Sequence, residues 1–189
     1  ELKGRQPSTQ AEKQAWDYAN ANIAVAEKKD QVTAAEAHKA AIEQIKTNAA
    51  KRQEEIRAKI KEILTNLASD KKAQIEQISK DVADKIAALP EIPKNISKDA
   101  RAKLVAKRQE EIDTIRGDAK TKIASVSSGA QAKKISEIES SRSTSEQVKA
   151  NVQASVENAR GKYQQLRQQL KDKYDTVRQQ ELEAIKANV

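Results

Sequence analysis

The feature that most constrains the fold is a long stretch without helix-breaking residues. From Trp16 to Leu67 the chain has neither Gly nor Pro. In the second half of this stretch, apolar side chains recur every three or four residues, which places them on one face of a helix. The stripe consists of Ile42, Ile45, Ala49, Ile56, Ile60, Ile63 and Leu67, with Arg52 as a single interruption. This pattern predicts a long amphipathic helix that packs against a neighbour as in a coiled coil.

The composition also favours long helices. Charged residues make up 34%, apolar residues 37% and aromatic residues 2% of the 189 residues, with four Gly and three Pro. Such a composition is typical of coiled coils and long helices. We therefore predict an all-α fold, an elongated antiparallel helical bundle or coiled coil of long amphipathic helices. Because Phe and Met are absent, aliphatic side chains must fill narrow seams, at roughly 1.5–3 kcal/mol for each fully buried one.

A capping motif marks the start of the first helix. Thr9-x-x-Glu12 is a capping box, in which each side chain accepts a hydrogen bond from the backbone N–H of the other residue. Residues 1–8 are then expected to form a loose leader, and residues 9–89 a helical region. Whether this region is one long helix or a helical hairpin that reverses near Ser69 stays open from the sequence.

A loop is predicted at residues 90–97, which contain two Pro residues. Ser97 has the side chain expected of the N-cap of the following helix. The same loop contains the sequon Asn95-Ile96-Ser97, so Asn95 is a candidate N-glycosylation site. This sequon slightly favours a eukaryotic secreted origin.

Two further helical parts are predicted after the loop. Residues 98–142 are expected to form a helix and then a short helix after a break at Gly129. Ser143-x-x-Glu146 is a second capping box, which predicts a long C-terminal helix over residues 143–189. Together, these helices are expected to form one structural domain.

The phrase AKRQEEI occurs twice, at residues 50–56 and 106–112, separated by a whole number of heptads. Both copies place an Ile in the apolar seam, one turn after an Arg that interrupts it. The sequences that follow the two copies differ completely, so the chain is not a solenoid of regular repeats. We interpret the phrase as local convergence or as the remnant of a duplication.

The sequence offers few groups for catalysis. His38 is the only histidine and there is no Cys, which excludes thiolate chemistry and paired-histidine metal sites but does not fix the compartment. Adjacent carboxylates such as Glu54 and Glu55 point about 100° apart on a helix, so they do not form a catalytic dyad. The sequence contains no glycine-rich phosphate loop, nucleophile elbow or EF-hand loop. We therefore expect no enzyme activity, no cofactor and no metal site.

The net charge of +8 raises the question of nucleic acid. Basic and acidic residues alternate along the chain, and there is no aromatic platform on which bases could stack. No specific nucleic-acid binding is therefore expected, although charge-driven binding to polyanions or anionic membranes remains an alternative. No apolar run approaches the roughly 20 residues of a transmembrane helix.

Residues 16–112 resemble the nematode SXP/RAL-2 family of secreted antigens. The matching features are Trp16, the segment NLASDKKAQIEQISKD, and then ISKDARAKLVAKRQEEI. The chain departs from the family in having Ser97 where the family has Thr and in lacking its Phe positions, and the C-terminal part is not covered. The resemblance implies a small, secreted, helical, non-enzymatic helminth protein.

The sequence thus predicts a non-enzymatic binding or scaffolding protein, secreted or exposed at the cell surface. Its partner would be another protein or a second copy, bound through the helix seams. The seam residues expected to carry the interaction are Ile56, Ile60, Ile63, Ile112, Ile115, Leu166 and Leu170. The alternative function is that of a carrier for a small apolar ligand such as a fatty acid. Because the chain begins at Glu1 without Met, we expect a processed mature protein, a domain fragment or a chain freed of its tag.

Overall fold

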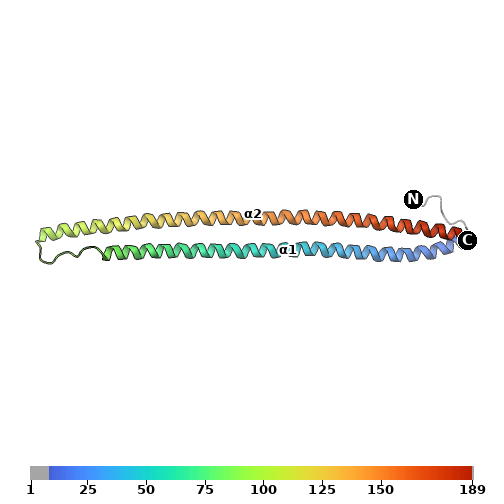
Figure 1. Ribbon diagram of the computed structural model, residues 1–189, viewed down its shortest axis with the longest axis horizontal. Helices are drawn as coiled ribbons and strands as arrows, with labels where there is room; N and C mark the ends of the chain where they lie inside the picture. The colour runs from blue at the N-terminus through green and yellow to red at the C-terminus, as the bar shows by residue number, and fades with distance from the viewer. Residues whose placement is uncertain (1–8, 189) are drawn as a thin grey trace. The chain divides into compact units, whose positions relative to one another are not determined.

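Two long helices make up almost all of the structure. The computed structural model describes residues 9–188, so the predicted leader lies outside the described part of the chain. Helix α1 spans Gln10–Ala87 and helix α2 spans Lys98–Asn188, and they pack antiparallel to each other (Figure 1). No strand occurs within residues 9–188. The predicted all-α fold of antiparallel helices is confirmed.

Contacts divide the chain into two compact units. The first unit joins the part of α1 up to Arg52 to the part of α2 from Gln147 onward, and the second unit is Gln53–Glu146. In each unit, one stretch of α1 runs antiparallel to one stretch of α2. The second unit also contains the connection between the helices. The expectation of one structural domain stays a prediction, because both units are formed by the same two continuous helices.

Both helix starts have the predicted caps. The Glu12 backbone N–H donates to Thr9 Oγ1 at 3.2 Å, and the Lys13 N–H donates to the Thr9 carbonyl at 2.9 Å. At the start of α2, the Ala100 N–H donates to Ser97 Oγ at 3.2 Å. These bonds satisfy N–H groups that have no partner within a helix, which explains why the helices begin at these residues.

Helix α1 does not reverse near Ser69. Of the two alternatives left open by the sequence, the single long helix is the observed one, and it ends at Ala87. The last turn tightens, because the Leu89 N–H donates to the Ile86 carbonyl at 3.2 Å. Pro90 follows at once, and a Pro cannot continue the helical hydrogen-bond pattern. The connection therefore covers 88–97, close to the predicted loop.

Two predicted breaks in the second half of the chain are wrong. Helix α2 continues through Gly129 and through the second predicted capping box at Ser143. A Gly in a helix interior costs about 1 kcal/mol relative to Ala, which weakens a helix without ending it. Beside Ser143, the Thr144 hydroxyl donates to the Ser140 carbonyl at 3.0 Å, a bond typical of a Thr inside a continuous helix.

The core is thin because only two helices contribute to each layer. Four apolar residues in the described part of the chain are buried, namely Ala34, Ala119, Tyr174 and Leu182. Most other residues between the helices are half-buried. Stability must therefore be the sum of many partly buried layers rather than the product of one central core.

The half-buried residues do not keep the heptad spacing of the repeated phrase over the whole second unit. Between Gln53 and Leu67 they advance by three and four positions, but from Leu67 to the connection they advance by four, four and three. The residues of this later stretch are Leu67, Lys71, Ile75, Ile78, Val82, Ile86 and Leu89. This is the spacing of an 11-residue repeat, about 3.67 residues per turn, rather than the 3.5 of a heptad. As the register drifts, Gln53 is half-buried and Arg52 is exposed, which is a correction to the predicted seam.

Candidate functional site

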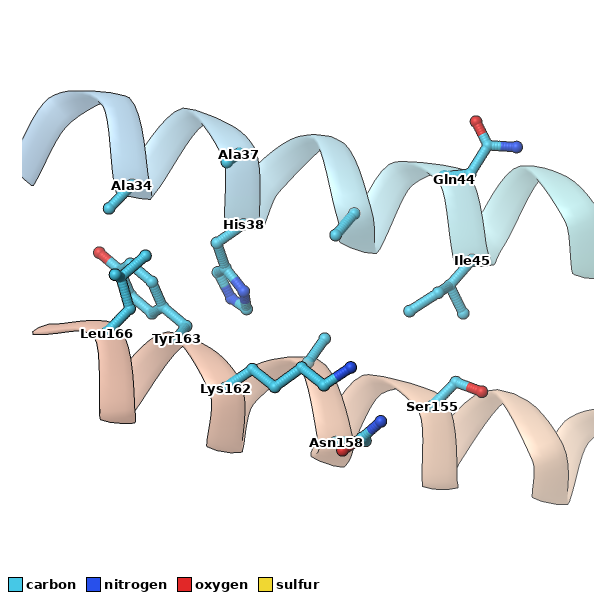
Figure 2. A pocket seen from close by; sticks show the side chains of 12 residues that line it. Ala34, Ala37, His38, Gln44, Ile45, Ser155, Asn158, Lys162, Tyr163 and Leu166 are labelled. Atoms are coloured by element: carbon cyan, nitrogen blue, oxygen red, sulfur yellow. The ribbon is translucent and has the colours of Figure 1, made fainter.

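An open, mostly apolar groove lies between the helices of the first unit (Figure 2). Its volume is about 470 Å³. Four of its lining residues are alanines: Ala34, Ala37 and Ala41 from α1, and Ala159 from α2. Packed helices are separated by about 8–10 Å, and methyl side chains are too short to fill that space. The groove is therefore a consequence of small residues meeting across the pair.

Two stacked rings lie toward one end of the groove. The His38 and Tyr163 rings are almost parallel, with an interplanar angle of 8° and centroids 4.4 Å apart. His38 comes from α1 and Tyr163 from α2, as Figure 2 shows. The Arg167 guanidinium carbon lies 5.8 Å from the Tyr163 ring centroid, within the range of a cation–π interaction. The lone histidine thus packs against a ring and belongs to the groove wall.

Polar groups lie along the α2 side of the groove. Ser155, Asn158 and Lys162 all line it and come from α2 (Figure 2). On the opposite side, Gln44 belongs to the lining from α1. An apolar floor with a cationic and amide-bearing edge is suited to an amphipathic partner that carries acidic groups beside its apolar surface.

A second cluster in the first unit centres on Tyr174. This side chain is buried, with 6% exposure, and its hydroxyl donates a hydrogen bond to the Asp30 carboxylate across the helix pair. Lys173 Nζ lies 3.6 Å from Asp30 Oδ2. The bond from Tyr174, helped by the charge of Lys173, lowers the pKa of Asp30 even though desolvation opposes the shift. Conversely, the bond to Asp30 raises the pKa of Tyr174.

Arg178 makes a further connection between the helices of this unit. Its Nη1 lies 2.6 Å from Glu27 Oε2, and its Nε donates to Asn20 Oδ1 at 3.1 Å. The contact with Glu27 is an ion pair rather than a directed hydrogen bond, since Glu27 Oε2 has no hydrogen-bond partner. Both side chains are about one-fifth exposed. With Tyr174, Arg178 fixes which residues of α1 lie opposite which residues of α2.

The second unit contains its own polar layer. Gln53 Nε2 donates to the Ser145 carbonyl at 3.1 Å, and Ser145 Oγ donates to Gln53 Oε1 at 2.7 Å. Near the connection, Arg108 Nη1 donates to the Pro90 carbonyl at 2.7 Å, which ties α2 to the loop. A polar pair in an otherwise apolar seam favours one register over its neighbours.

The predicted seam residues differ in how far they are covered. Those in the second unit are half-buried, and they are Ile56, Ile60, Ile63, Ile112 and Ile115. In the first unit, Leu170 is half-buried, whereas Leu166 is 39% exposed and lines the groove. The interaction role expected of these residues stays a prediction. Asn95, the candidate glycosylation site, is exposed in the loop.

Sequence reasoning missed the polar contacts and had only a partial signal for the groove. The alanines at spacings of three and four were visible, but the facing Ala159 could be paired with them only once the register was known. Asp30 and Glu27 lie three residues apart at seam positions, where a carboxylate is unexpected without a partner. That was the available signal for the contacts of Tyr174 and Arg178.

No cluster of three or more His, Cys, Asp or Glu side chains within residues 9–188 could hold a metal ion. No helix in the described part of the chain is long and apolar enough to cross a membrane.

Comparison with known proteins gives no match. No family model, no curated protein and no solved structure matches the chain. The resemblance to the SXP/RAL-2 family therefore stays a prediction. The groove, the charges and the exposed apolar residues are the features of the chain that bear on its function.

Proposed function

We propose that the protein is a non-enzymatic binding and scaffolding module, extracellular or surface-exposed, that receives an amphipathic helix of a protein partner in the alanine-walled groove. The groove is the single observation that carries this proposal. Its lining comes from residues 34–45 of α1 and 155–166 of α2, so it extends over about three turns of each helix. A third helix laid along both would match this form, as in other helix-in-groove complexes.

The groove also supports a helix as the occupant through its packing and charge. The small alanine side chains allow the backbone of a partner helix to come close to α1 and α2. Leu166, which is 39% exposed, offers a larger apolar contact beside them. Burial of such surface contributes about 25 cal/mol per Å². Lys162 in the lining, with Arg167 beside Tyr163, would attract acidic residues on the flanks of the partner helix.

The proposal is tested with a substitution that fills the groove and leaves the other contacts between the helices in place. Ala41→Trp places a large side chain in the groove, whereas Ala40→Trp places the same side chain on an exposed neighbouring position outside its lining. Amphipathic helical peptides selected from a display library against the unchanged protein are expected to bind Ala41→Trp at least about tenfold more weakly, since roughly 1.4 kcal/mol of contact is lost. They should bind Ala40→Trp normally.

Two results would contradict this function. The selection could return no helical peptide above background, or the selected peptides could bind both variants equally. Sedimentation equilibrium of the protein alone shows whether a second copy is the partner. In that case Ala41→Trp should shift the association toward monomer and Ala40→Trp should not.

A second candidate is a carrier of a small apolar ligand with a carboxylate, such as a fatty acid. The volume of about 470 Å³ lies within the roughly 300–1,000 Å³ of small-molecule sites, and Lys162 could pair with the carboxylate. The groove is open to solvent, which favours the helix over a ligand that must be enclosed. Native mass spectrometry of delipidated protein mixed with a fatty acid separates the two, because the carrier alone predicts a stoichiometric complex lost in Ala41→Trp.

A further inference from the structure

The start of α2 presents apolar side chains that no helix covers. Helix α1 ends at Ala87 and α2 begins at Lys98, so the first turns of α2 lie beside the loop 88–97 instead of beside a helix (Figure 1). Here Leu104 is 39% exposed and Val105 is 47% exposed. They continue the seam of the second unit past the point where its partner helix stops.

These two aliphatic residues are surrounded by exposed cations. Four basic side chains of the same stretch are exposed: Lys98, Arg101, Lys103 and Lys107. Asp99 is the only carboxylate among residues 98–108. We call these four cations, together with Leu104 and Val105, the basic tip. Residues 119–136 and 158–171 also contain four basic residues and no carboxylate, but the basic residues there are spread over longer stretches. The basic tip is the denser cluster, with four basic residues and no carboxylate in the eight positions 101–108.

The helix spacing places the parts of the basic tip together. Residues three and four apart lie on one face, so Arg101 is beside both Leu104 and Val105, and Lys107 is beside Leu104. Arg108, one turn after Leu104, donates through Nη1 to the Pro90 carbonyl at 2.7 Å. This bond holds the loop against α2 next to the patch, and it fixes the surface that a partner would meet.

We propose that the basic tip binds the surface of an anionic lipid bilayer, a specific form of the charge-driven binding considered above and independent of the groove. A bilayer interface offers negatively charged headgroups to the cations and an apolar layer to Leu104 and Val105 at the same time. Long Lys and Arg side chains can reach headgroups while their aliphatic stems cover apolar surface. The complementarity is thus one of charge and of hydrophobicity.

Nucleic acid is a poorer match to the same patch. It offers phosphate groups to the cations but no apolar surface for the two exposed aliphatic residues. Bases would stack on aromatic rings, and the aromatic residues of the chain, Trp16, Tyr18, Tyr163 and Tyr174, all belong to the first unit. The basic tip therefore has no stacking platform.

The experiment measures co-sedimentation with phosphatidylcholine vesicles that contain or lack phosphatidylserine, at low and at physiological salt. The unchanged protein should bind the anionic vesicles, more weakly as salt rises, and should not bind pure phosphatidylcholine. The triple variant Lys98→Gln, Arg101→Gln, Lys103→Gln should bind about tenfold more weakly or worse. Its matched control removes one Arg and two Lys that are exposed near carboxylates further along α2, at Arg116, Lys171 and Lys186, and should retain most of the binding.

A second variant separates lipid from other polyanions. Leu104→Ser with Val105→Ser keeps every charge and should weaken binding to anionic vesicles while binding to heparin stays unchanged. Equal losses in the tip and control triple variants would overturn the proposal, since binding would then follow net charge alone. Binding to heparin or to an oligonucleotide without binding to anionic vesicles would overturn it as well. Circular dichroism confirms that each variant is as helical as the unchanged protein.

Discussion

At the scale of single residues, the cross-helix bond between Tyr174 and Asp30 links stability to pH. The hydrogen bond from Tyr174 holds the pKa of Asp30 below its ordinary value in the folded protein. A carboxylate of this kind stabilises the fold above its unfolded pKa, and this contribution is lost as pH falls through the folded value. The pKa of Tyr174 is raised, so its contribution is present below the ordinary value near 10 and is lost as pH rises through the folded one.

Tyr174→Phe should therefore change the pH dependence of the melting temperature at both ends. Without the hydroxyl donor, the pKa of Asp30 returns toward its ordinary value, and the melting temperature should fall less steeply in acid. Thermal melts followed by circular dichroism between acidic and alkaline pH measure this. Tyr18→Phe is the control, because Tyr18 is exposed. If the melting temperatures of the unchanged protein and of Tyr174→Phe fall equally steeply with decreasing pH, the bond between Tyr174 and Asp30 does not link folding to pH.

Two arginines allow a comparison of a mostly buried and an exposed ion pair. Arg178→Ala leaves Glu27 partly buried without its counter-charge and should lower the free energy of unfolding by about 1–2 kcal/mol. Arg57→Ala removes the contact with Glu54, where both side chains are about three-quarters exposed, and should cost less than about 0.5 kcal/mol. Urea denaturation measures both values. The assigned role of Arg178 in joining the helices is wrong if the two costs are equal.

At the scale of the helices, the chain tolerates residues that usually weaken them. Gly117, Gly129 and Gly161 all lie inside α2, and an added Cβ at each would meet no atom within 4 Å. The structure therefore gives no packing reason for these glycines. They reduce the intrinsic preference of α2 for the helical state without shaping its contacts.

Gly129→Ala should raise the free energy of unfolding by about 0.5–1 kcal/mol, because Ala loses less backbone freedom on folding. Ala132→Gly, three residues further on at an exposed position, should lower it by a similar amount. Urea denaturation of both variants measures the pair. A destabilised Gly129→Ala would instead indicate that the chain needs a break there, as the sequence first suggested.

The helices were more predictable than the site. Thr9 and Ser97 cap the two helices as their side chains indicated, because such caps depend on neighbouring residues alone. Ser143 has the same local signature, yet it lies in a helix interior, since the residues on both sides continue the apolar pattern of α2. The groove and the Tyr174 cluster depend on which residues of α1 face which residues of α2. That register is set by the whole pairing, and no local pattern contains it.

At the scale of the whole molecule, each layer of side chains contacts mainly the layers next to it within its unit. Stability in such an arrangement is close to a sum of neighbouring contributions, and parts of it can open without the rest. Arg178→Ala should therefore speed amide hydrogen exchange most near residues 20–30 and 174–182. Exchange near residues 60–85, in the other unit, should change little. Exchange by mass spectrometry measures this, and uniform acceleration would instead show a single cooperative unit.

The bond between Gln53 and Ser145 has a consequence for how the chain acquires its pairing. Helix α1 is synthesised before α2, and a hairpin displaced by one turn would still match aliphatic groups with aliphatic groups, since Ile, Leu and Val are nearly interchangeable in so thin a seam. In such a displaced hairpin, the Gln53 amide would face an apolar side chain and would lose its hydrogen bonds to Ser145. The two hydrogen bonds between Gln53 and Ser145 form only in the correct pairing of the helices. They therefore favour this pairing over one displaced by a helical turn.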